Sequence, residues 1–112
     1  MWPSYAPLGY VNVDTSRPIT QALAVVSVKK GKAVTMRFSV TDLTPSATVT
    51  IKIFKGTKLK KTLTVGVKPT NSPQSYKWTC KLVKGSYTWK VYAVDAAGNV
   101  QGTVGSKALK VK

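Results

Sequence analysis

Few residues of this chain are able to do acid–base or nucleophilic chemistry. The sequence has no histidine and no glutamate, and its carboxylates are Asp14, Asp42 and Asp95. The absence of histidine removes the commonest general base, together with the Ser-His-Asp and Cys-His arrangements. A catalytic pair would have to combine Asp42 with Asp95, because Asp14 falls in a predicted linker. Both of these residues follow predicted strands as turn residues, so we expect no enzyme.

The same two aspartates are the candidate ligands of a metal ion. Hard cations such as Ca²⁺ prefer clustered carboxylate and carbonyl oxygens, and the strand ends that carry Asp42 and Asp95 can lie at the same pole of a β-sandwich. Two carboxylates in a chain of net charge +15 would nevertheless make a weak site. The single cysteine, Cys80, excludes an internal disulfide and a multi-cysteine zinc site. We therefore expect neither a metal nor a cofactor.

The charge balance suggests what the chain attracts. Sixteen lysines and two arginines face three aspartates, and such a surplus draws polyanions such as nucleic acid, anionic lipid or anionic cell-wall polymer. Bidentate recognition of phosphates and of guanine favours arginine over lysine, so the composition favours diffuse attraction and no specific nucleic-acid recognition. The alternative is a solvated lysine face that protects strand edges from aggregation. The longest lysine cluster, at 55–61, is predicted to be a hairpin tip.

The elements that position these residues are predicted to be β-strands, because apolar and polar residues alternate along most of the chain. No segment shows sustained helical periodicity, and Gly-, Pro- and Asn-rich turns separate the alternating stretches. The seven predicted strands are 20–28, 33–40, 47–54, 59–67, 76–82, 86–94 and 107–112. Strands of this length and spacing are typical of an all-β, immunoglobulin-like two-sheet antiparallel sandwich of about seven strands. A small closed barrel is the main alternative.

The chain length of 112 residues fits one domain. Residues 1–18 contain three prolines and are predicted to be a linker or the end of a preceding module, with the sandwich domain at 19–112. No long apolar stretch predicts a membrane span. The first residues lack the basic start and apolar core of a signal peptide, so we expect a cytosolic chain or a piece of a larger exported protein.

Three segments resemble a known class of module. "DTSRP" at 14–18 resembles the Asp-Thr-Thr-x-Pro linkers that open repeated Ig-like modules of bacterial surface proteins, and "KGSYTWKVYAVDAAGN" at 84–99 resembles their closing signature. The segment 47–66 is similar to a hairpin of Ig-like domains such as that of flagellar hook-capping proteins. The resemblance covers about residues 14–112. It implies an extracellular, multi-domain setting in which the module is a spacer, an adhesin segment or an accessory domain.

Each residue of the closing segment has an expected structural role. Tyr87 and Trp89 alternate with polar residues and are expected to face the core. Tyr87 also stands where an Ig-like fold often carries its tyrosine corner. Asp95 is expected to accept hydrogen bonds from turn amides, Gly98 to supply a positive φ, and Asn99 to tolerate an unusual φ. These four residues, Tyr87, Asp95, Gly98 and Asn99, form the predicted structural signature.

Two further side chains are predicted to belong to the core. Trp78 shares the apolar phase of its strand, and so does Cys80. We interpret Cys80 as a small buried core residue. The alternative is a thiol for intermolecular linkage or lipidation.

The best-localised binding candidate is a patch of two aromatics and two lysines. Phe54 and Tyr92 are out of phase with the apolar residues of their strands, and in an Ig-like sandwich these two strands are adjacent. Lys52 and Lys90 would complete an outward patch suited to stacking on sugars or bases, or to docking a neighbouring domain. The alternative is that Phe54 lies under a loop and Tyr92 is an ordinary cross-strand partner.

Together these features predict a non-catalytic module of a larger bacterial cell-surface or secreted protein, acting as a spacer, presentation or adhesion domain. Its expected partners are neighbouring domains of the same polypeptide and an anionic wall polymer or glycan, and we expect an extracellular monomer. One alternative is an accessory module that binds carbohydrate, anionic wall polymer or a protein partner. A further alternative is a nonspecific nucleic-acid binder.

Overall fold

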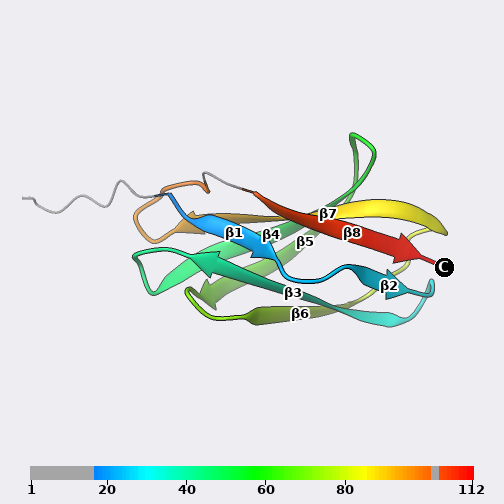
Figure 1. Ribbon diagram of the computed structural model, residues 1–112, viewed down its shortest axis with the longest axis horizontal. Coiled ribbons are helices and arrows are strands. Elements are labelled where there is room, and N and C mark those ends of the chain that lie inside the picture. The colour runs from blue at the N-terminus through cyan, green and yellow to red at the C-terminus, as the bar shows by residue number, and fades with distance from the viewer. Residues whose placement is uncertain (1–16, 102–103) are drawn as a thin grey trace, which may run out of the picture.

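The computed structural model describes residues 17–101 and 104–112, and it is built entirely from β-strands. Two sheets pack face to face around one core (Figure 1). The three-stranded sheet has the order β1-β3-β6, and the five-stranded sheet has the order β2-β8-β7-β4-β5. The strands are β1 (Ile19–Ala22), β2 (Val26–Val28), β3 (Ala33–Thr41), β4 (Ser46–Lys55), β5 (Lys58–Pro69), β6 (Gln74–Thr79), β7 (Gly85–Asp95) and β8 (Gly105–Val111). The predicted all-β sandwich is confirmed.

The core lies between the sheets, and the alternation of the sequence produces it. On β3 every second residue is buried, and Met36 and Phe38 are fully enclosed. On β7 the same alternation buries Trp89 and Val91 against them. A buried side chain of this size contributes about 1.5–3 kcal/mol, so this paired alternation is the main favourable term that holds the sheets together.

The first strand differs from its prediction. The segment 20–28 forms two strands in different sheets: β1 pairs antiparallel with β3, whereas β2 pairs parallel with β8. The chain crosses between the sheets at 23–25, where Val25 is exposed. The backbone of β1 lies close against the start of β8. A Cβ added to Gly105 would lie only 2.5 Å from Gln21 Cα, so the glycine permits this approach. Residues 17–101 and 104–112 therefore form eight strands, one more than the seven predicted segments.

Strand β5 departs from the alternation of its sequence. The pattern of 59–67, broken by Lys61, predicts one apolar face that carries Leu59, Leu63, Val65 and Val67. Of these Leu63 alone is buried, and Leu59 and Val67 are exposed. The β4–β5 ladder shifts register at two points, next to Val65 and again next to Leu59. Gly66 has a φ of +94° at the first shift. Each bulge reverses the direction in which the residues beyond it point, which explains the exposed side chains.

Cys80 lies just beyond β6 and is fully buried in the core, as predicted. Its N–H donates to the Lys32 carbonyl, and its carbonyl accepts from the Gly31 N–H. Trp78 is half-buried and packs against the same core. Within residues 17–101 and 104–112, no helix has the length and hydrophobicity that crossing a membrane would require.

Candidate functional site

Lys52, Phe54, Lys90 and Tyr92 lie together on the outer face of the five-stranded sheet, and we call them the Lys–aromatic patch. β4 and β7 are neighbours, and Lys52 is directly opposite Lys90 in their ladder. Each ammonium crosses to an aromatic ring of the other strand: Lys52 Nζ lies 4.8 Å from the Tyr92 ring centroid, and Lys90 Nζ lies 5.0 Å from that of Phe54. Like charges directly opposite each other in a ladder are destabilising. The contact of each ammonium with a ring of the other strand offsets part of this repulsion.

The two crossed pairs create an amphipathic surface. All four side chains are half-exposed. Each cation–π contact contributes about 0.5–1 kcal/mol at an exposed site, so a ligand can displace an ammonium from a ring at modest cost. The patch can then offer aromatic faces for stacking and two cations for an anionic group. Phe54 lies within the ladder opposite Thr88, so its ring belongs to the sheet surface.

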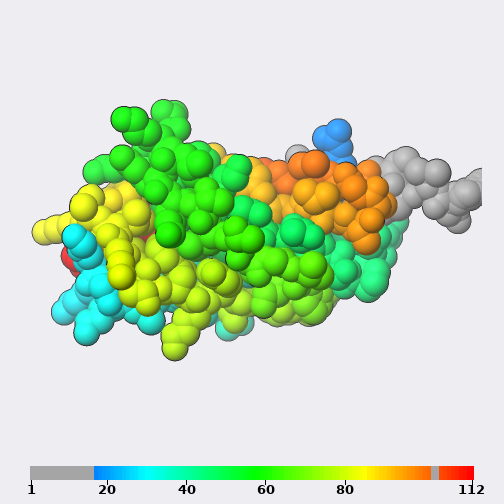
Figure 2. All heavy atoms as spheres, turned by 180° about the vertical axis from the view of Figure 1, so that it is seen from behind, coloured from blue at the N-terminus to red at the C-terminus, as the bar shows by residue number. Residues whose placement is uncertain are grey.

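The turns at one end of the sandwich carry a dense group of lysines, which we call the basic pole. The β2–β3, β4–β5 and β6–β7 turns lie together there, coloured cyan, green and yellow in Figure 2. Pairing of Gly85 with Val111 brings the end of β8 to the same place. All of its lysines are exposed: Lys29, Lys30, Lys32, Lys55, Lys58, Lys81, Lys84 and Lys112. This grouping was not predicted, although the alternating direction of successive strands places these turns at one end.

The opposite end carries both described aspartates. Asp95 ends β7, and its Oδ1 accepts hydrogen bonds from the N–H groups of Ala97 (2.9 Å) and Asn99 (2.8 Å). Its Oδ2 accepts from Asn99 Nδ2 at 3.1 Å, and Gly98 in this turn has a φ of +90°. Burial opposes ionisation of Asp95, but the hydrogen bonds that its carboxylate accepts from Asn99 and Ala97 outweigh it, so the pKa of Asp95 is lowered.

Asp42 follows β3 at the same end of the sandwich. Its Oδ2 accepts from the backbone N–H and the hydroxyl of Thr44. Asn71 clamps its backbone, since Asn71 Oδ1 accepts from the Asp42 N–H and Asn71 Nδ2 donates to the Asp42 carbonyl. Asn71 achieves this with a φ of 63°, a conformation that asparagine tolerates better than most residues.

Tyr87 lies away from both aspartates and forms the bond typical of a tyrosine corner. Its ring is buried, and its hydroxyl donates to the Val83 carbonyl at 2.7 Å. Lys55 Nζ lies 5.8 Å from the ring centroid. This arrangement has a structural role at the start of β7 and contains no group for catalysis.

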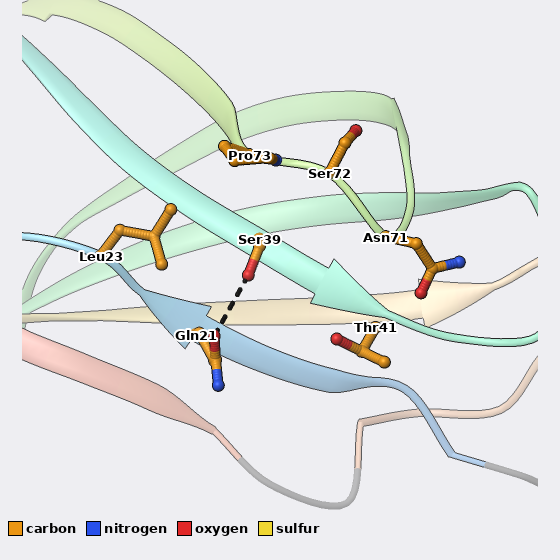
Figure 3. A pocket seen from close by; sticks show the side chains of 7 residues that line it. All are labelled: Gln21, Leu23, Ser39, Thr41, Asn71, Ser72 and Pro73. Atoms are coloured by element: carbon orange, nitrogen blue, oxygen red, sulfur yellow. Dashed lines mark hydrogen bonds between the residues drawn. The ribbon is translucent and has the colours of Figure 1, made fainter.

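A shallow groove on the three-stranded sheet was not predicted (Figure 3). Its lining comes from β1, β3 and the β5–β6 loop: Gln21, Leu23, Ser39, Thr41, Asn71, Ser72 and Pro73. Ser39 Oγ donates to Gln21 Oε1 at 3.4 Å across the groove. The seven side chains are uncharged, so the groove can offer hydrogen bonds but no acid–base chemistry.

Two solved structures share this arrangement of strands. The CARDB domain of the PF1109 protein from Pyrococcus furiosus, solved in complex with di-metal ions, has a TM-score of 0.56 and 19% identity. The alignment covers 84% of this chain and 91% of that one. The PKD domain of an M14-like peptidase from a Thermoplasmatales archaeon has a TM-score of 0.57 and 18% identity, over 85% of this chain and 92% of that one.

The fold is immunoglobulin-like. Both neighbours are domains of larger proteins, and CARDB and PKD domains are non-catalytic Ig-like modules. No protein-family model matches the sequence, and no curated protein is significantly similar to it. The resemblance to flagellar hook-capping proteins therefore stays a prediction. Of the predicted opening linker, residues 1–16 lie outside the described residues.

Proposed function

We propose that the chain is a non-catalytic Ig-like module of a larger bacterial cell-surface or secreted protein, which spaces or presents neighbouring domains and adheres to anionic polymer through its basic pole. The domain extends over 19–112, after a linker at 1–18. The fold and the modular nature of its structural neighbours support the first part. The second part is carried by one observation, the gathering of eight exposed lysines at a single end of the sandwich.

The chemistry of the basic pole favours a flexible, repetitive polyanion over a specific site. Every cation of the pole is a lysine, a point charge on a flexible stem that lacks the rigid fork with which arginine binds one phosphate or carboxylate. The lysines come from four separate segments, so they form a field and not a pocket. Such a field raises the local concentration of a polyanion and weakens as salt shortens the Debye length to about 8 Å at physiological ionic strength.

The test measures binding of the chain to immobilised polyphosphate, a plain polyanion, between 50 and 300 mM NaCl. A variant with Lys30, Lys58 and Lys84 changed to Gln removes three charges from the basic pole. A control with Lys68, Lys77 and Lys107 changed to Gln removes three charges outside the basic pole and the Lys–aromatic patch. We expect the pole variant to lose about tenfold more affinity than the control, and binding to weaken steadily with salt. Equal losses in the two variants would contradict the role of the pole.

A second candidate function is ligand binding at the Lys–aromatic patch, with carbohydrate, anionic wall polymer or a protein partner as ligand. It is favoured by the crossed contacts that bring Phe54 and Tyr92 to one outer face beside two lysines. Replacing both aromatics with Ala should abolish binding in a glycan or wall-polymer screen and leave the fold intact. A control changes Thr50 and Thr88, their ladder partners, to Ala. Unchanged binding by the aromatic double variant would exclude the patch.

Nonspecific binding of nucleic acid is the remaining alternative, and the salt dependence distinguishes it. A protein that neutralises several phosphates of duplex DNA loses affinity with a steep slope of log K against log salt, close to −0.9 per phosphate. The scarcity of arginine argues against this alternative.

A further inference from the structure

A small cavity lies at the rim between β5 and β6. These strands are edge strands of different sheets, so the sandwich is open between them. The rim is seen in Figure 2, where the green surface of β5 meets the yellow-green surface of β6. The cavity has a volume of about 150 Å³ and is lined by Lys61, Trp78, Thr79, Lys81 and Leu82. Sites for drug-sized ligands measure about 300–1,000 Å³, so this one suits a single ring-sized group.

Lys61 lies on the inner side of β5, where the sequence pattern calls for an apolar residue. It is paired with Ile53 in the β4–β5 ladder, and directly paired residues share one face of a sheet. Ile53 is buried in the core, and so is Leu63, two residues beyond Lys61. Lys61 is nevertheless exposed, because β5 is the edge of its sheet. Its ammonium is therefore carried on the side of the strand that faces the rim.

Trp78 borders the same cavity from the facing sheet. It is paired with Val34 in the β3–β6 ladder, and Val34 is buried, so the indole is on the inner side of β6. Trp78 and Leu82 are half-buried and pack against the core. The indole Nε1 is buried and has no hydrogen-bond partner among the described residues, so packing holds the ring in place. The cavity thus has an apolar wall opposite a lysine.

A second lysine adds to the positive charge of the cavity. Lys81 follows β6, so it approaches from a different element than Lys61 does. Asp95 is paired with Ala47 on β4, six residues from Ile53, which is about 20 Å along the strand. This is more than two Debye lengths of about 8 Å, so Asp95 neutralises little of the charge. An inward-pointing lysine alone would be an ordinary protection of an edge strand, but this protection requires neither a second lysine nor an indole.

We propose that this cavity, which we call the rim site, binds one acidic sugar unit of a polyuronate, a pyranose ring that carries a carboxylate. The apolar face of the ring packs on Trp78 and Leu82, and the carboxylate pairs with the ammonium groups of Lys61 and Lys81. Apolar walls with a few placed polar groups are the usual composition of a site that orients its ligand.

The rim site deepens the proposed function and rests on it for the kind of polymer that the module adheres to. Lys81 belongs to both the rim site and the basic pole, so a polyuronate with one unit in the cavity continues over the lysines of the pole. The pole then supplies diffuse attraction that any polyanion experiences. The rim site adds a preference for a carboxylate on a sugar ring.

The experiment titrates the full chain with trigalacturonate and follows the indole N–H signals by ¹H–¹⁵N NMR. A Trp78→Phe variant identifies the signal of Trp78 among those of the three tryptophans. This signal should shift in a saturable way, with a dissociation constant of about 1 mM, as expected for a small ligand with few contacts. The uncharged methyl ester of the same trisaccharide should bind about tenfold more weakly, because it cannot pair with the lysines. The absence of a saturable shift, or equal binding of the ester, overturns the proposal.

The matched variants are Lys61→Gln and Lys60→Gln, which remove one charge each from adjacent exposed positions of β5. Of the two residues only Lys61 lines the cavity. Lys61→Gln should lose about tenfold in affinity for trigalacturonate, whereas Lys60→Gln should stay close to the parent. Equal losses would show a general effect of charge and refute the rim site.

Polyphosphate separates the rim site from the basic pole. Neither Lys60 nor Lys61 belongs to the pole, so both variants should bind polyphosphate alike. A selective loss of polyphosphate binding in Lys61→Gln would mean that the cavity responds to charge alone, which contradicts the preference for a sugar. If polyphosphate binding proves independent of the pole while trigalacturonate still shifts the Trp78 signal and requires Lys61, adhesion through the pole is wrong and the rim site stands.

Discussion

Thr20 is the residue through which β1 is joined to the facing sheet. It is 1% exposed, and its hydroxyl donates to the Val91 carbonyl at 2.7 Å and accepts from the Gly105 N–H at 2.8 Å. Val91 lies on β7 and Gly105 begins β8. The substitution Thr20→Val keeps the shape of the side chain and removes both hydrogen bonds.

The expected cost of Thr20→Val follows from the two backbone groups that lose this partner. A buried donor or acceptor left without its hydrogen bond costs about 1–3 kcal/mol, so we expect a loss of about 2–4 kcal/mol in the free energy of unfolding. This is a large share of the roughly 5–15 kcal/mol that stabilises a domain. The control Thr20→Ser keeps the hydroxyl and deletes one methyl group, at a cost of about 1 kcal/mol.

The measurement is urea-induced unfolding followed by tryptophan fluorescence, to which the buried Trp89 contributes, with the free energy taken from linear extrapolation. Thr20→Val should unfold at a clearly lower urea concentration than Thr20→Ser, with an unchanged slope. If the two variants are equally stable, the hydroxyl does not hold β1 to the facing sheet, and the reasoning is refuted.

Three further predictions concern single residues. Tyr87→Phe removes the bond to the Val83 carbonyl; because Val83 is exposed and its carbonyl can turn to water, we expect a loss of about 1 kcal/mol and a melting temperature about 4 °C lower. Since the pKa of Asp95 is lower in the folded state, its stabilising contribution is present above its unfolded value of 3.8 and is lost as the pH falls through the lowered value. The loss of stability on acidification below about pH 4 should therefore be flatter in Asp95→Asn than in the parent, and an unchanged profile would contradict this. The Cys80 thiol is buried, so it should react with a thiol reagent only once urea unfolds the chain, and rapid reaction in the native state would contradict its core position.

The uninterrupted strands could be predicted from the sequence, because period-two alternation assigns each residue to a face without further information. The core positions Phe38 and Trp89, and the outward positions Phe54 and Tyr92, followed from phase alone. The split of 20–28 did not, since no turn residue interrupts that segment. Nor did the exposure of Val67, which depends on a bulge that alternation cannot reveal.

The polar groupings were predictable only where strand ends define them. Asp42 and Asp95 each follow a strand, so their shared pole followed from a sandwich topology, but the unpartnered Asp42 Oδ1 depends on the positions of Thr44 and Asn71. The groove of Figure 3 draws on three segments that are far apart in the sequence. Such a surface has no local signature, so only the folded chain displays it.

The distribution of charge separates the proposed polyanion surface from the described aspartates. The basic pole lies at the start of β3 and Asp42 lies just beyond its end, nine residues later, which is about 30 Å along a strand. This is several Debye lengths at physiological ionic strength, so Asp42 weakens the field of the pole only slightly. Had this carboxylate lain among the turns of the pole, it would have neutralised part of the charge on which the proposed adhesion depends.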